Sequence, residues 1–249
     1  MYVDSHCHLT FDELFQRKED VLRNMEKVSY AMIMCTNEEE FQRALIYKKE
    51  DPKRFKIAWG WHPQDANTIT EDHLIKLQKA LDQHQLDCLG EIGLDYYWDS
   101  SFKERQKELL IRQLHMANQA GLPVSIHMRN ATLDTLSILK QHAKTPIIFH
   151  CFSGSKETMK ECLKMDSMIS FAGPITFKNA KKNVLCVKEC PMERILSETD
   201  SPFLTPVPFR GQKNEPMYVE YVTKKICEIK QLALETVCSQ IQRNFLSLF

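Results

Sequence analysis

Glycine is scarce in this sequence, with seven residues in 249, and no Gly-rich turn follows an early strand. Dinucleotide-binding folds use such a turn to bring the backbone close to a pyrophosphate. The chain also lacks an internal repeat, a low-complexity tract and a linker rich in Gly, Ser or Pro. We therefore expect a single domain over residues 1–249 and no organic cofactor.

Net charge is absent as well, since 33 Lys and Arg residues balance 33 Asp and Glu residues. A neutral chain has no overall field that would hold it on DNA or on an anionic membrane, so any attraction to nucleic acid must be local. No apolar run approaches the roughly 20 residues that a membrane-spanning helix needs. We expect no membrane association, and nothing in the sequence indicates an obligate protein partner.

The nine cysteines form no CxxC pair, which argues against a disulfide framework and against a zinc knuckle. The sequence also shows no leader with a charged and an apolar region. Together these features favour a reducing compartment, and we expect a cytoplasmic location.

Short apolar runs alternate with longer helical patterns along nearly the whole chain, which is typical of a parallel sheet with crossover helices. Eight such units predict an α/β fold with a single closed (β/α)8 TIM-type barrel; an open doubly wound sheet is the alternative. The predicted strands cover residues 1–6, 30–36, 55–60, 87–93, 123–127, 146–151, 167–172 and 194–199. Capping boxes are predicted at Thr10–Glu13 and Ser101–Glu104 and, in a looser form, at Asn37–Glu40. Two helices over about 215–248 are expected to close the barrel floor.

Residues that can bind a metal or transfer a proton recur at the ends of the predicted strands. Alternate residues of a strand face the same side, so Asp4, His6 and His8 can point into one site while Cys7 points away; we expect Cys151 to point away too. The other strand-end candidates are His62, Glu91, Asp95, His127, His150 and Asp200. Reacting groups of (β/α)8 barrels lie at the C-terminal ends of the strands, so we expect these side chains to meet.

Four histidines and two carboxylates are too many ligands for one structural zinc and suit a pair of divalent ions. Glu91 is central in strand order and is the candidate bridge, because a carboxylate can offer one oxygen to each ion. Asp200 is placed either to bind a metal or to take a proton from a metal-activated water. Asp95 and Glu198 are expected to orient ligands. The residue types leave Zn, Mg and Mn open.

Several motifs occur in a recognisable order. They are His6-x-His8, GEIGLDYY at 90–97, IHMR at 126–129, FHCFSG at 149–154, ETDSPFLTP at 198–206 and RGQKNEP at 210–216. In these motifs the sequence resembles the TatD family of metal-dependent hydrolases and deoxyribonucleases. The resemblance implies an amidohydrolase-type barrel with two divalent metal ions.

The same resemblance implies a role for individual residues. It places His6, His8, Glu91 and Asp200 around one metal and Glu91, His127 and His150 around the other. It also implies that His62, Arg129 and the loop holding Arg210 face the substrate. Trp61 and Met128 are larger than the residues expected beside His62 and His127, which bears on the width of the pocket.

The favoured function is therefore a metal-dependent hydrolase, a deoxyribonuclease of the 3′–5′ exonuclease type with DNA as substrate and with Asp200 and Glu91 as catalytic residues. Candidate phosphate-binding or base-stacking groups are Arg129, Lys178, Lys181, Lys182, Arg210, Lys213, Tyr96, Tyr97, Trp98 and Phe203. Hydrolysis of an amide, ester or lactone is the second hypothesis, because the same chemistry permits it on the same fold. A binding scaffold with a vestigial metal site is the third.

Overall fold

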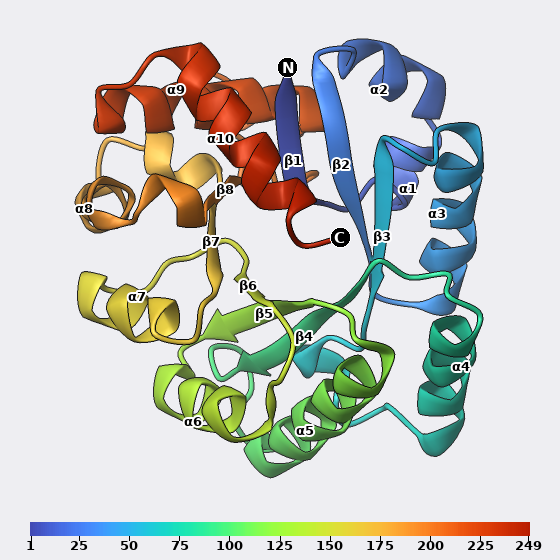
Figure 1. The fold of residues 1–249 in the computed structure, drawn as a ribbon. Helices are drawn as coiled ribbons and strands as arrows, with labels where there is room; N and C mark the ends of the chain where they lie inside the picture. The colour runs from blue at the N-terminus through green and yellow to red at the C-terminus, as the bar shows by residue number, and fades with distance from the viewer.

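Eight parallel strands pair in chain order from β1 to β8 in the computed structural model, which describes residues 1–249. The helices lie around the outside of this sheet (Figure 1). The strands are β1 (Tyr2–Cys7), β2 (Val28–Cys35), β3 (Phe55–Trp59), β4 (Cys88–Asp95), β5 (Val124–Arg129), β6 (Ile147–Phe149), β7 (Met168–Phe171) and β8 (Ile195–Ser197). The predicted (β/α)8 barrel is confirmed, and the open doubly wound sheet is excluded.

Hydrogen bonds between the first and last strands bring the barrel close to closure. Ser197 Oγ donates to the carbonyl of Val3 at 2.9 Å. Beyond the strand ends, the amide of Asp200 donates to the carbonyl of His6 at 2.9 Å, and the amide of His8 donates to the carbonyl of Ser201 at 2.8 Å. The segment after β8 is thereby fixed against the end of β1.

The helices pack on the outer face of the sheet and share its apolar core. Phe41 of α3 stacks on Trp59 at the end of β3, with ring centroids 4.7 Å apart. The α-helices are α1 (Asp12–Phe15), α2 (Lys18–Asn24), α3 (Glu38–Glu50), α4 (Glu71–Asp82), α5 (Lys103–Ala120), α6 (Thr132–His142), α7 (Lys156–Leu163), α8 (Lys181–Glu189), α9 (Val219–Lys230) and α10 (Leu234–Leu246). Short 3-10 turns are η1 (Pro63–Asp65), η2 (Gly173–Thr176), η3 (Met192–Arg194) and η4 (Pro216–Tyr218). None of the helices is long and apolar enough to cross a membrane.

The two predicted C-terminal helices are present as α9 and α10. Asn244 of α10 donates from Nδ2 to the carbonyls of Met192 and Ile195, both at 2.8 Å. Its neighbour Phe245 is fully buried and lies 6.1 Å from the ring of Tyr30, at the start of β2. The end of α10 therefore covers the N-terminal end of the barrel, as predicted.

The capping predictions were right at one position of three. Asn37 accepts from the amide of Glu40 at 2.9 Å, and Glu40 accepts in return from the amide of Thr36 at 2.8 Å. The other two predictions are wrong, because α1 and α5 each begin after a Phe that makes no side-chain cap. A box that the pattern did not predict begins α4, where the amide of Thr70 donates to His73 Nδ1 at 3.0 Å. An imidazole there replaces the Glu or Gln that defines the usual pattern.

Candidate active site

The candidate residues lie on five of the strands or in the segments directly after them, and they come together at the C-terminal end of the barrel. They are His6 of β1 with His8 just beyond it, Glu91 of β4, His127 of β5, His150 directly after β6, and Asp200 in the segment after β8. The pairing register of β4 with β5 shifts between Leu89 and Ile92. Such an irregularity re-aims side chains, and Glu91 lies within it.

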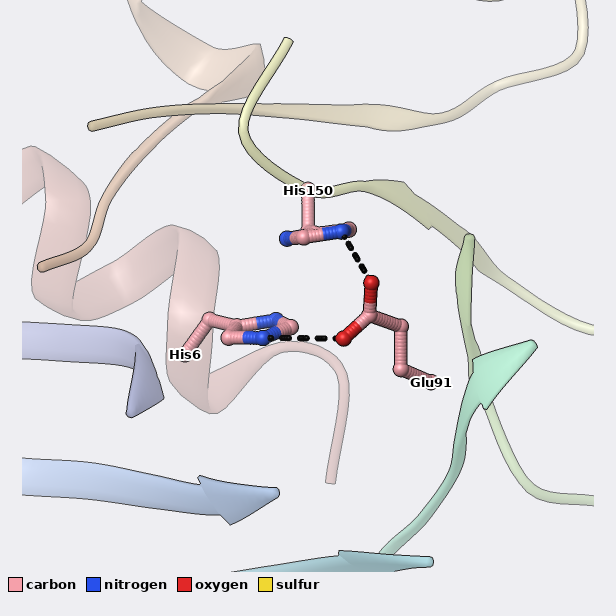
Figure 2. A group of neighbouring side chains, drawn as sticks. All are labelled: His6, Glu91 and His150. Atoms are coloured by element: carbon pink, nitrogen blue, oxygen red, sulfur yellow. Dashed lines mark ion pairs between the residues drawn. The ribbon is translucent and has the colours of Figure 1, made fainter. Parts of the chain in front are cut away.

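Glu91 presents its two carboxylate oxygens to different histidines. Its Oε1 atom lies 2.6 Å from His127 Nδ1 and 2.7 Å from His150 Nε2. Its Oε2 atom lies 3.4 Å from His6 Nε2 and 4.0 Å from His8 Nε2. Figure 2 shows the carboxylate between His6 and His150, with one oxygen directed to each ring. This is the arrangement that a bridging carboxylate requires.

Asp200 completes the group on the His6 side of Glu91. Its Oδ1 atom lies 3.5 Å from the Nε2 atoms of both His6 and His8. Those two Nε2 atoms are themselves 3.3 Å apart. Three side chains from opposite ends of the sequence thus direct their donor atoms at one point.

The donor set fits divalent metal ions by its chemistry. Three overlapping groups, His6–Glu91–His150, His6–His8–Asp200 and His62–Glu91–His127, each hold donor atoms within 4.8 Å of one another. Burial lowers the pKa of His6, so that this imidazole is neutral, as a ligand must be. Burial alone would raise the pKa of Glu91, but His150, His127 and His6 outweigh it and hold that pKa well below its usual range. A buried carboxylate that stays ionised among imidazoles is suited to a cation.

Two further carboxylates contact the outer nitrogens of the histidines. Asp95 Oδ2 lies 3.0 Å from His127 Nε2. Glu198 Oε1 lies 3.5 Å from His150 Nδ1 and accepts from the amide of Cys151 at 2.7 Å. Burial raises the pKa of Asp95, but hydrogen bonds from His127 and the Tyr97 amide outweigh it and hold the pKa at about 2. A carboxylate in such a contact can fix the orientation of the imidazole ring beside it.

Asp4 does not join the site, although strand alternation allowed it to. Its carboxylate accepts from the amide of Thr199 at 2.8 Å and from the Thr199 hydroxyl at 2.6 Å. The register of β1 with β2 shifts between Asp4 and Cys7, and this shift interrupts the alternation that the prediction assumed. Cys7 does point away, since its Sγ donates to the carbonyl of Met32 on β2 at 3.4 Å.

Comparison with known proteins adds to this geometry. Residues 3–249 match the family model described as TatD related DNase. The chain belongs to the TatD family. It is 41% identical to the metal-dependent hydrolase YabD of Bacillus subtilis, with 100% of this chain and 99% of the relative covered. It is 32% identical to the metal-dependent hydrolase YcfH of Escherichia coli, with 99% and 95% covered.

Solved structures agree with this assignment. The TatD homologue YJJV of Escherichia coli superposes with a TM-score of 0.92 at 30% identity, covering 100% of this chain and 97% of that one. The organophosphorus hydrolase of Deinococcus radiodurans shares the fold alone, with a TM-score of 0.66 at 10% identity and coverage of 99% and 91%. The protein is therefore a metal-dependent hydrolase of the TatD family with a (β/α)8 barrel.

A cavity of about 710 Å³ opens over the histidines of this TatD barrel. Arg129 lies on its wall, with its guanidinium 3.8 Å from the ring centroid of Tyr97. Phe203 lines it as well, in edge contact with Phe11 at 5.8 Å between ring centroids. His62 also lines the cavity, and its Nε2 atom is 3.5 Å from Glu91 Oε1, so it reaches the metal-ligand candidates themselves.

Several lining residues were not among those singled out from the sequence. They are Phe11, Thr36, Gln64, Asp65, Ser153, Pro174 and Leu204. Ser153 and Leu204 nevertheless lie within the motifs at 149–154 and 198–206. Gln64 lies two residues after His62, so a search of that turn could have found it. Met128 lines the cavity, whereas the ring nitrogen of the buried Trp61 donates to the carbonyl of His73 at 3.2 Å and does not narrow the pocket.

Cys151 lines the cavity, which contradicts the expectation that it faces away. Strand β6 ends at Phe149, and Cys151 has a φ of 41°, so strand alternation does not extend to it.

Most of the predicted phosphate-binding groups are also absent from the cavity wall. Arg210 lies over the ring of Phe177 at 4.3 Å, and Lys213 pairs with Glu13. Lys178, Lys181 and Lys182 do not line the cavity either. Of the basic candidates, the structure brings only Arg129 to the histidines.

Proposed function

We propose that the protein is a deoxyribonuclease of the 3′–5′ exonuclease type that hydrolyses phosphodiester bonds at this centre with two divalent ions. The observation that carries the proposal is the division of the Glu91 carboxylate between His127 and His150 on one oxygen and His6 on the other. The family description as a TatD related DNase supports DNA as the substrate. When bound, a pair of divalent ions activates water and neutralises charge on a phosphate.

The residues of the chain would bind the ions, accept a proton and bind the phosphate. His6, His8 and Asp200 would hold one ion, His127 and His150 the other, and Glu91 both. Asp200 Oδ1 is directed at the Nε2 atoms of His6 and His8, where it can accept a proton from an attacking water as general base. His62 and Arg129 line the cavity and can hydrogen bond to phosphate oxygens.

The test is cleavage of a short, labelled, single-stranded DNA by metal-stripped protein reconstituted with Mg²⁺, Mn²⁺ or Zn²⁺. Loss of an outer partner of a metal ligand typically costs about 10- to 100-fold in activity. Glu91→Ala removes a ligand itself and should lower cleavage by more than about 100-fold. The control is Glu71→Ala, which removes an exposed carboxylate of α4 and should leave cleavage unaltered. Stepwise shortening from the 3′ end would support an exonuclease, and internal fragments would contradict it.

One observation favours hydrolysis of an amide, ester or lactone as a second candidate. Arg129 is the only Arg or Lys on the cavity wall, whereas a phosphodiester substrate benefits from several cationic groups. If the metal-loaded protein binds two ions but leaves DNA intact, an ester and a lactone are the next substrates to assay. Turnover of either, lost in Glu91→Ala, would replace the nuclease proposal.

A further inference from the structure

A second cavity of about 380 Å³ adjoins the metal-ligand cavity. It lies between η1 and the segment that joins β4 to α5, and its lining residues are Gln64, Asp95, Trp98, Asp99, Phe102 and Gln106. Gln64 and Trp98 line both cavities, so the two lie side by side. Its volume falls in the range of roughly 300 to 1,000 Å³ that is usual for small-molecule sites.

Most polar groups of this second cavity are already paired with one another. Gln106 accepts from the amide of Asp95 and donates to its carbonyl, both at 2.9 Å. The Asp95 carboxylate accepts from Gln64 Nε2 at 3.0 Å and from the amide of Tyr97 at 2.9 Å. These contacts make the floor of the cavity rigid and leave little of it free for a ligand.

Asp99 is the charged group that remains available. Its Oδ1 atom accepts from the amide of Ser101 at 2.8 Å, and the carboxylate forms no ion pair. The hydrogen bonds of Ser101 lower the pKa of Asp99, so the carboxylate is ionised at neutral pH. An ionised carboxylate repels phosphate and accepts hydrogen bonds from N–H groups. The cavity therefore favours a ligand that brings donors and no negative charge.

Aromatic side chains supply the rest of the lining. Trp98 is 68% exposed, and Phe102 lies on the same cavity wall. Exposed indole faces are surfaces on which unpaired nucleobases stack. Arg129 lies 5.4 Å from the Trp98 ring centroid and lines the metal-ligand cavity. A DNA strand with a phosphate beside Arg129 could thus place the neighbouring base beside Trp98.

We propose that the second cavity binds a guanine base of the nucleotide next to the bond that is cut, with Trp98 stacking on the ring and Asp99 accepting from its N1–H and 2-amino groups. Guanine is the base that offers two adjacent donors on its pairing edge, and each oxygen of the Asp99 carboxylate can accept one of them, because Oδ1 keeps a second lone pair beside the Ser101 amide. Thymine offers one N–H donor between two carbonyl oxygens. These oxygens are acceptors and would be repelled by the oxygens of the carboxylate. The proposal rests on the nuclease function proposed above and adds a base preference to it.

The test uses thymidine tracts that contain a single deoxyguanosine, or deoxyinosine in its place, and compares the rate at each bond from the product ladder. A two-point hydrogen-bonded contact discriminates between bases on the order of tenfold. Wild-type protein with Mn²⁺ should cut one bond beside the deoxyguanosine about tenfold faster than the other bonds of the tract. Deoxyinosine lacks the 2-amino group and should show a smaller preference.

Asp99→Asn keeps the size of the side chain and an oxygen for the Ser101 amide but replaces the free acceptor with a donor. It should reduce the guanine preference to near parity, whereas Asp72→Asn, an exposed position on α4, should retain it. Equal cleavage rates at all bonds in wild type, or an equal loss of rate at all bonds in Asp99→Asn, would contradict guanine binding in the second cavity. Either result would still be consistent with the proposed nuclease activity. Absence of any cleavage by metal-loaded wild type would overturn both.

Discussion

The two oxygens of Glu91 face different histidines, which makes this side chain a link between the two halves of the centre. Glu91→Gln keeps its shape but removes the charge and one of the two strong acceptors. Calorimetric titration of the metal-stripped variant with Mn²⁺ should show at most one bound ion, against two for wild type. Glu71→Gln, on the surface of α4, serves as the control. Two ions bound by Glu91→Gln with wild-type affinity would rule out the bridging role.

Asp95 ties the stability of the metal-free protein to pH. Its pKa falls from 3.8 to about 2 in the folded state, so the folded form binds fewer protons than the unfolded chain between these values. The stabilisation is therefore essentially complete above about pH 5 and is lost as pH falls towards 2. Each unit of pKa difference is worth about 1.4 kcal/mol, so Asp95 contributes about 2 kcal/mol. Urea unfolding from pH 5 to pH 2 should show a flatter pH dependence in Asp95→Asn than in wild type, and parallel curves would contradict the assignment.

The segment after β8 carries Asp200 and depends on one buried amide. Asn214 donates from Nδ2 to the carbonyl of Thr199 at 2.9 Å and also to the carbonyl of Phe203. Asn214→Ala leaves buried carbonyls without a donor, a loss of about 1 to 3 kcal/mol in the free energy of unfolding. Because Asp200 lies between these carbonyls, Mn²⁺ affinity should fall as well, by about tenfold or more.

Asn118→Ala is the matched control for Asn214→Ala. Asn118 donates to the carbonyl of His142 at 2.7 Å and accepts from the amide of Lys144 at 2.9 Å, on the outer side of the barrel. It should lose stability in urea and keep its affinity for Mn²⁺. Equal losses of metal affinity in both variants would show that the bonds of Asn214 have no special connection with Asp200.

The strands could be predicted from the sequence because their periodicity is a local property. The path of the loops could not be predicted, because loops have no such periodicity. All eight strands begin and end within about two residues of their predicted bounds. The strand-end histidines therefore met as expected. Cys151 and Arg210 lie outside strands, where alternation does not apply. Cys151 has a left-handed backbone conformation, and Arg210 packs on the ring of Phe177. The alternation of apolar and polar residues in the sequence predicts neither feature.

The metal-ligand centre draws on β1, β4, β5, β6 and the segment after β8, so it can form only when the ring of strands is complete. Helix α10 secures that ring from the opposite end. Phe245 is fully buried there against Tyr30 and Phe249. The candidate ligands lie at the other end of the barrel, so Phe245 does not contact them. Its removal should therefore weaken the site through the fold and not through direct contact.

Phe245→Ala should lower the free energy of unfolding by about 3 to 5 kcal/mol, the usual cost of truncating a buried Phe. If residues 1–249 are one domain, thermal unfolding of the variant should remain a single transition, and release of bound Mn²⁺ should coincide with loss of the far-ultraviolet circular dichroism signal. Two separated transitions, with metal retained through the first, would mean that the half of the barrel carrying β4, β5 and β6 folds without its closing strands. The single-domain prediction would then be wrong, and Glu91, His127 and His150 would have to hold an ion by themselves.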